Sequence, residues 1–262
     1  MSFDFQTLAD AIDYGFGTGF RPDYTVMAGA QLHVKTAPCI IDALTRFSQS
    51  GLYGWTDSDD PLYIRAVVNW MAKVRGWEIE PSWIVPSYGI LQAMCASIRA
   101  FTQPGGKVLM QTPIYPPFTE LTKANGRVCS MNPLKFVNGR YEVDFEDFER
   151  RAADPDCSLF LLCSPHNPTG RVFSADELNR FVEICAAHDV VILSDEVHSG
   201  FVFKGEHAFL PGLSETAARI SVWGSSPSKT FNTAGLRAAS LGSKNPELNA
   251  KLKAELTASQ PD

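Results

Sequence analysis

The chain has 262 residues, of which 45% are hydrophobic and 20% are charged, as is typical of a folded globular protein. Its net charge is −6 and no stretch concentrates Lys or Arg, which argues against a nucleic-acid partner. No apolar run approaches the roughly 20 residues of a membrane helix, so no membrane partner is expected.

The N-terminus and the cysteines bear on the compartment. Residues 1–10 are acidic and lack an apolar centre, so no signal peptide is predicted. The cysteines are scattered without a C-x-x-C pair, and most have apolar neighbours, which predicts small core residues rather than metal ligands. We therefore expect a cytoplasmic protein without a metal site.

The first part of the chain predicts an arm followed by a helix. Residues 1–45 are rich in Gly and aromatic residues, and we expect an irregular N-terminal arm or small-domain segment. Asp60 and Pro61 are suited to the N-cap and first position of a helix, and Gly76 is suited to its end. Residues 46–262 are expected to form one large domain.

From residue 83 onward, short apolar strands alternate with amphipathic helices. Strands are expected at 83–85, 107–111, 127–131, 158–163, 190–193, 220–223 and 238–241, and helices at 90–101, 144–153, 174–188 and 246–256. This alternation predicts an α/β fold with three α/β/α layers and a mainly parallel sheet. Ligands in such sheets bind at the carboxyl ends of the strands.

One lysine follows a predicted strand among small hydroxyl residues. Taken alone, Lys229 would usually be an ordinary surface cation. Schiff-base chemistry requires an amine whose pKa is lowered by burial or by a nearby cation. Arg237 could be that cation and could also bind a phosphate.

Two ionisable residues follow another apolar strand. Asp195 could be a helix cap or a structural ion-pair member, or a carboxylate that keeps a pyridine nitrogen protonated. His198 comes three residues later and would face the same side of a turn. A lone histidine in this position is more often a core residue.

Three further segments follow strand ends. Asn167 lies between two prolines, which would aim its amide at a fixed point, although such a loop alone indicates only a turn. Gly89, Ile90 and Leu91 open a helix whose free N–H groups suit a phosphate. Tyr115 is held by prolines and could stack on a flat ring or belong to the core.

Together and in this order, these motifs resemble the class I/II aminotransferase superfamily of pyridoxal 5′-phosphate (PLP) enzymes. More narrowly, they look like the MalY/PatB-type cystathionine β-lyase branch of carbon–sulfur lyases. The resemblance spans residues 35–256 and is carried by Pro113-x-Tyr115, Asn167-Pro168-x-Gly170, Ser194-Asp195-Glu196-x-His198 and Ser226-x-Ser228-Lys229-Thr230-Phe231-Asn232.

The resemblance implies a function and a role for each motif. Lys229 would hold PLP covalently and remove the Cα proton of an amino-acid substrate, with Tyr115 stacked on the ring as the second catalytic residue. The ring nitrogen would face Asp195, and the ring hydroxyl would lie near Asn167 and His198. The phosphate would be bound by Gly89, Ile90, Leu91, Ser226 and Arg237. The products would be pyruvate, ammonia and a thiol, formed in a homodimer.

The sequence departs from this branch at three places. Gln31 and His33 stand where the branch has acidic residues, and Trp55 stands where it has tyrosine. The resemblance implies a C-terminal small domain with a carboxylate-binding arginine, and we expect these 262 residues to lack it. Two alternatives therefore stay open beside the lyase: a PLP-dependent aminotransferase, and a truncated non-catalytic remnant that binds cofactor or dimerises.

Overall fold

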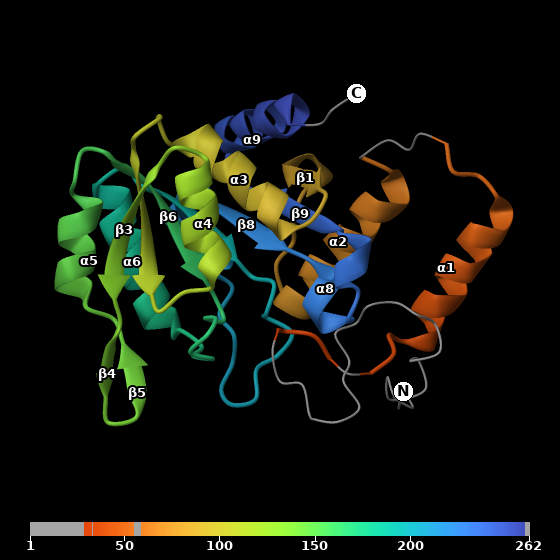
Figure 1. Ribbon diagram of the computed structural model, residues 1–262, viewed down its shortest axis with the longest axis horizontal. Coiled ribbons are helices and arrows are strands. Elements are labelled where there is room, and N and C mark those ends of the chain that lie inside the picture. The colour runs from red at the N-terminus through yellow and green to blue at the C-terminus, as the bar shows by residue number, and fades with distance from the viewer. Residues whose placement is uncertain (1–28, 33, 55–58, 260–262) are drawn as a thin grey trace.

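The computed structural model describes residues 29–32, 34–54 and 59–259 (Figure 1). Its centre is a sheet of seven strands in the order β1-β9-β8-β7-β6-β2-β3. The strands are β1 (Ile84–Ser87), β2 (Lys107–Thr112), β3 (Val128–Pro133), β6 (Cys157–Cys163), β7 (Val191–Asp195), β8 (Ser221–Ser225) and β9 (Ala239–Gly242).

The sheet is mainly parallel, as predicted. Neighbouring strands from β3 to β8 pair in parallel, whereas β9 pairs antiparallel with both β8 and β1. Strand β1 therefore runs in the same direction as β8. The carboxyl ends of all the parallel strands meet at one edge of the sheet, and the antiparallel strand β9 begins there.

Helices cover both faces of the sheet, which confirms the three-layer fold. The helices are α1 (Pro38–Ser50), α2 (Pro61–Arg75), α3 (Ile90–Phe101), α4 (Pro116–Ala124), α5 (Phe145–Ala152), α6 (Ala175–Ala187), α7 (Glu215–Ile220), α8 (Pro227–Thr230) and α9 (Pro246–Ala258). Residues of α3, α4 and α9 share one apolar core with the sheet, while α5, α6 and α7 contribute to a second. A third cluster joins α2 to Trp223 of β8.

Local sequence signals explain the helix boundaries that were predicted well. Asp60 Oδ1 accepts hydrogen bonds from the amides of Leu62 and Tyr63 at 2.7 and 3.2 Å, and Gly76 ends α2 in the left-handed conformation. Ser174 and Glu177 form a reciprocal capping box at the start of α6. These contacts satisfy backbone groups that a helix end would otherwise leave unpaired.

Some elements differ from the sequence interpretation. Residues 38–50 form the helix α1, whereas residues up to 45 were expected to be irregular. Helix α4, helix α7 and the hairpin of β4 (Lys135–Val137) and β5 (Arg140–Glu142) were also missed. Helix α1 has no buried residue, so its formation depends on local preference and a proline at its first position rather than on packing. Among the described residues, no helix has the length and apolar character needed to cross a membrane.

We predict that β9 depends on a glycine packed against Trp223. A Cβ added at Gly242 would overlap the indole of Trp223, a side chain that is fully buried. Gly242→Ala should lower the free energy of unfolding by about 1–3 kcal/mol, because a packed core cannot absorb the extra methyl group. Gly235→Ala is the control, since no atom lies within 4 Å of a Cβ added there. Urea denaturation of both variants measures the difference, and an equal effect would contradict this account.

Candidate functional site at the strand ends

The sheet topology brings the predicted site residues to one edge. Gly89 follows β1, Tyr115 follows β2, Asn167 follows β6 and Asp195 ends β7. Ser226 and Lys229 follow β8, and Arg237 precedes β9. Because β9 runs antiparallel to its neighbours, its first residues lie at the edge where the parallel strands end. Segments far apart in the sequence are thereby collected into one region.

Lys229 lies on the short helix α8, directly after β8. The hydroxyl of Ser226 accepts a hydrogen bond from the amide of Ser228 at 3.1 Å and caps this helix. The amine Nζ of Lys229 donates to the carbonyl oxygen of Ala30 at 2.8 Å. Burial lowers the pKa of Lys229, and the negative charge of Asp195 acts in the opposite direction. A lowered pKa increases the fraction of free, nucleophilic amine at neutral pH.

Asp195 is a buried carboxyl group at the carboxyl end of β7, with only 5% of its surface exposed. Its Oδ1 accepts a hydrogen bond from the amide of Val197 at 3.1 Å. Burial raises the pKa of Asp195 to about 7; the Val197 hydrogen bond opposes the rise, Glu196 adds to it and Lys229 opposes it. The charged form of this buried carboxyl is therefore stabilised only when a cationic group lies close to it.

His198 lies in the turn that follows Asp195 and Glu196. Burial lowers the pKa of His198, and the positive charge of Lys229 lowers it further. A histidine with a lowered pKa is neutral at pH 7, so that one ring nitrogen can donate a hydrogen bond and the other can accept one.

Tyr115 and Asn167 come from two loops that are hydrogen-bonded to each other. The amide of Tyr115 donates to the carbonyl oxygen of Asn167 at 3.1 Å. The amide of Asn167 donates to Sγ of the buried Cys163 at 3.3 Å, which ties the loop to β6. The Tyr115 side chain is 40% exposed at the strand-end edge, where a ligand can reach its ring. These contacts fix two neighbouring loops relative to the sheet.

Gly89 and Arg237 lie beside each other at the start of α3. A Cβ added at Gly89 would lie 3.8 Å from the backbone oxygen of Arg237. Gly89 has a φ of 93°, and no side chain caps the first amides of α3, which belong to Ile90 and Leu91. Ser226 Oγ donates to the carbonyl oxygen of Ala238 at 2.7 Å, which joins this segment to β9. Uncapped helix amides with an arginine on the adjacent segment are suited to bind an anion.

The structure also contains polar contacts that the sequence interpretation missed. Glu196, 1% exposed, accepts a hydrogen bond from Ser194 Oγ at 2.6 Å and contacts His207 Nε2 through its other carboxylate oxygen. The backbone amide of Glu196 donates to the carbonyl oxygen of Gly224 of β8 at 2.8 Å, so this residue also ties the strand end that carries Asp195 to β8. A glutamate inside an apolar segment could have indicated a buried pair, but no local pattern identifies His207.

A segment near the N-terminus lies along the lysine-bearing turn. Asn232 Nδ2 donates to the carbonyl oxygens of Leu32 and Val34 at 3.0 and 2.7 Å. Thr36 Oγ1 donates to the carbonyl oxygen of Phe231 at 2.6 Å. Gln31 is exposed, whereas His33 and Trp55, the other two departures from the branch, lie outside the described residues.

The fold is an α/β fold with a mainly parallel sheet, and its strand-end edge carries a lysine and a buried acid. The model of the family "Aminotransferase class I and II" matches residues 23–257. The chain therefore belongs to the aminotransferase class I and II family.

Curated relatives and solved structures give the same family. The chain is 39% identical over 228 residues to cystathionine β-lyase PatB from Bacillus subtilis, covering 87% of this chain and 59% of that protein. It is 30% identical over 224 residues to protein MalY from Escherichia coli, covering 86% of this chain and 56% of the relative. The crystal structure of cystalysin from Treponema denticola, which contains PLP, aligns with a TM-score of 0.89 at 29% identity, covering 99% of this chain and 68% of that one. The chain thus spans less than two thirds of the length of these curated relatives.

The raised pKa of Asp195 predicts how the stability of the cofactor-free protein depends on pH. Asp195 in the folded state holds its proton up to about pH 7, whereas in the unfolded chain it releases the proton near its ordinary pKa of 3.8. The folded state therefore binds more protons in this window, and the stability contribution of the protonated carboxyl is lost as the pH rises through it. The difference between the two pKa values corresponds to about 4 kcal/mol.

We expect wild type to lose stability relative to Asp195→Asn as the pH rises from 3.8 to about 7. Urea denaturation of the cofactor-free proteins at several pH values measures this difference. Asp176→Asn, at an exposed position in the first turn of α6, should follow wild type. A constant difference between wild type and Asp195→Asn would show that the acid ionises normally.

Proposed function

We propose that this chain is the cofactor-binding part of a PLP-dependent carbon–sulfur β-lyase. Its substrates would be cystathionine or related cysteine S-conjugates, which α,β-elimination converts into pyruvate, ammonia and a thiol. The observation that carries the proposal is the pair formed by the half-buried amine of Lys229 and the buried carboxyl of Asp195, whose charges influence each other. Similarity to a cystathionine β-lyase supports the choice of reaction.

The donor set of the site fits PLP. An aldehyde needs a free amine, and burial shifts Lys229 toward that form. A pyridine nitrogen needs an acid, and the buried Asp195 would gain a cationic partner in direct contact, in addition to the more distant charge of Lys229. A phosphate needs N–H donors and a cation, which the start of α3, Ser226 and Arg237 can provide.

When bound, PLP supplies an electron sink that stabilises negative charge at the substrate Cα. Within this proposal, Lys229 would hold the cofactor, and its Nζ would remove the Cα proton of the substrate. Asp195 would keep the ring nitrogen protonated. Asn167 and His198 would contact the ring hydroxyl, and Tyr115 would stack on the ring as the second catalytic residue. The amides of Ile90 and Leu91, after Gly89, bind the phosphate together with Ser226 and Arg237.

Transamination is the second candidate, because the family that matches is that of class I and II aminotransferases. Both reactions begin when Lys229 removes the Cα proton. A lyase then loses a thiolate from Cβ, whereas an aminotransferase returns the proton to the cofactor side and needs a keto acid. The same site residues serve either course, so the products must separate them.

We predict that the PLP-loaded chain converts cystathionine into equal amounts of pyruvate and free thiol without an added keto acid. Lys229→Ala should lower the rate at least about a hundredfold, because the base that moves the Cα proton is removed. Lys244→Ala is the matched control, since Lys244 lies at the surface and pairs with Glu215 at 2.6 Å. Pyruvate and thiol are measured by coupled reduction and by a thiol reagent.

Other outcomes of this experiment support the alternatives. Accumulation of pyridoxamine phosphate without thiol release would favour the aminotransferase. PLP bound at Lys229, detected by borohydride reduction and peptide mass spectrometry, with neither product would favour a non-catalytic role in which the chain binds cofactor without turnover. No label on Lys229 would contradict the whole proposal.

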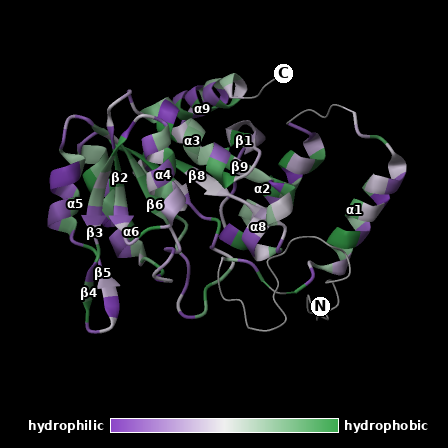
Figure 2. Cartoon of the chain, in the orientation of Figure 1, coloured by the Kyte–Doolittle hydropathy of each residue, from purple (hydrophilic) through white to green (hydrophobic). Residues whose placement is uncertain are grey.

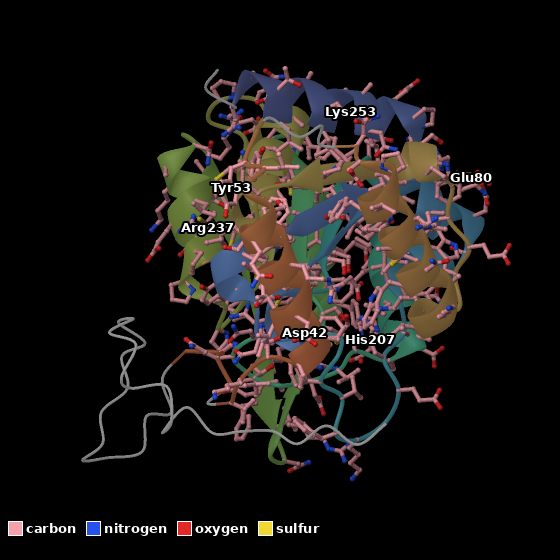
Figure 3. All side chains as sticks on the ribbon, turned by 90° about the vertical axis from the view of Figure 1, so that its right-hand side faces the viewer. Asp42, Tyr53, Glu80, His207, Arg237 and Lys253 are labelled. Carbon is pink, nitrogen blue, oxygen red and sulfur yellow. The ribbon has the colours of Figure 1, made fainter. Side chains whose placement is uncertain are left out.

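We also propose that the protein forms a homodimer through α1. This helix lies at one end of the molecule, apart from the sheet (Figure 1), and carries both hydrophilic and hydrophobic residues (Figure 2). Ile41, Leu44 and Phe47 are 41%, 42% and 57% exposed, and Leu52 and Tyr53 just beyond the helix are more exposed still. Figure 3 shows this side of the molecule facing the viewer, with Asp42 and Tyr53 labelled. A contiguous apolar surface of this kind is typical of a protein–protein interface.

We predict that Phe47→Asp lowers the dimer affinity at least about tenfold, since it places a charge within an apolar interface. Phe136→Asp is the control, because Phe136 is 66% exposed on the β4–β5 hairpin, away from α1. Sedimentation equilibrium over a range of concentrations gives both dissociation constants. A monomeric wild type, or equal effects of the two substitutions, would rule out α1 as the interface.

The compartment and the domain division complete the proposal. We infer a cytoplasmic location, which is supported by six free cysteines, three of them buried. Residues 46–262 would form the PLP-binding large domain and residues 1–45 an arm, with α1 crossing this boundary.

A further inference from the structure

A cavity of about 210 Å³ lies between α2 and the segment that connects β8 to α8. Its walls come from α2, from the turn after β7, from residues 225–231 and from β9. Of the predicted cofactor-binding residues, all of which the structure describes, Ser226 alone lines it. The cavity therefore adjoins the lysine-bearing helix but is separate from the proposed PLP site.

One part of the cavity wall is apolar and aromatic. Val67, Trp70 and Met71 line it from α2, and Pro227 and Phe231 line it from the opposite side. The rings of Trp70 and Phe231 have centroids 5.4 Å apart and an interplanar angle of 68°. An engineered apolar cavity of about 150 Å³ is large enough to bind benzene. This cavity is larger, so it can hold one aromatic ring with a small substituent.

The cavity wall also includes a cation that lacks an ion pair. Arg75, the last residue of α2, uses its guanidinium to contact Oγ of Ser199 and, at 3.4 Å, the carbonyl oxygen of Ser199. No carboxylate of the described residues lies within salt-bridge distance of Arg75. Burial lowers the pKa of Arg75, and the charge of Glu196 opposes this effect without a direct contact. A partly buried guanidinium is stabilised by a bound anion, and its planar donors match a carboxylate.

The remaining polar groups are less suited to hold a ligand. The hydroxyl of Tyr63 contacts the carbonyl oxygen of Ala239 at 2.9 Å and Oγ of Ser240 at 2.7 Å. Ser226 Oγ donates to Ala238, as described above. Arg75 is thus the charged group of the lining, and it determines the polarity of a ligand that fits.

We propose that this cavity binds a small carboxylic acid with an aromatic body. The carboxylate pairs with Arg75, and the ring packs against the apolar wall formed by Trp70, Phe231 and Pro227. Such an acid is distinct from the amino-acid substrate, because Lys229 does not line the cavity. A ligand in this cavity contacts Pro227 before Lys229 and Thr230 and Phe231 after it. Binding at the cavity therefore acts on the turn that carries Lys229.

Benzoate is the probe, and isothermal titration of the PLP-loaded chain measures its binding independently of turnover. We expect a saturable isotherm for benzoate and at least about tenfold weaker binding of the neutral isostere benzamide. Trp70 provides a second signal, because a ligand in contact with its ring changes the tryptophan fluorescence. Absence of saturable benzoate binding, or equal affinity for benzamide, would overturn the proposal.

Three variants locate the binding. Arg75→Met should weaken benzoate binding at least about tenfold and leave benzamide binding unchanged, because the lost interaction is a charged hydrogen bond. Arg65→Met, at an exposed position on the same helix, should bind benzoate like wild type. Ala66→Leu places a larger side chain at an exposed position of the lining and should weaken both ligands.

Ala66→Leu keeps the test decisive if Arg75→Met fails to fold, since leucine is a good helix former at an exposed helix position. Unchanged benzoate affinity in this folded variant would place the ligand elsewhere. Unchanged affinity in a folded Arg75→Met protein would likewise overturn the assignment of the carboxylate to Arg75.

Discussion

The burial of one carboxyl group at the end of a strand governs the organisation of this molecule. Asp195 is 5% exposed, and its pKa is raised to about 7 because the sheet and its loops remove it from water. Lys229 is subject to the opposite effect, since burial lowers its pKa. Burial thus disfavours the charged form of each group, and the opposite charge of the other group partly offsets this effect. A cofactor with a basic ring nitrogen and an aldehyde matches both groups, which is why this pair supports the proposed chemistry better than any single motif.

The sheet topology makes this pair possible. Asp195 is paired in register with Cys163 of β6 and with Gly224 of β8, so it has a strand on both sides. The reversal of β9 has a further consequence, because it returns the chain to the same edge and brings Arg237 beside Gly89. A purely parallel sheet would have required a longer connection to place Arg237 there. The antiparallel strand β9 therefore brings Arg237 to the proposed anion site.

The sequence predicted what local signals encode. The helix at 90–101 has the expected bounds, and the capping contacts of Asp60 and Ser174 account for the starts of two other helices. Apolar runs located each strand of the main sheet within a few residues. What was missed depends on tertiary contacts or on weak local patterns. The Glu196–His207 pair joins a strand end to a distant loop, and the short hairpin of β4 and β5 has exposed residues without a buried face. The cavity beside Arg75 arises from four separate segments and has no sequence signature.

The contact between the N-terminal segment and the lysine-bearing turn bears on the departures from the lyase branch. Ala30, Leu32 and Val34 all engage this turn through their backbone carbonyl oxygens, which accept hydrogen bonds from Lys229 and Asn232. Backbone acceptors are the same for every residue type, so these contacts do not require the acidic side chains that the branch carries in this segment. The exposed Gln31 can therefore replace an acid without loosening the segment from the turn. What such a replacement changes is the charge near the Lys229 amine. An acid in this segment would favour the protonated amine and so raise the pKa of Lys229. A neutral glutamine has no such effect, so the lowering of this pKa by burial is opposed less.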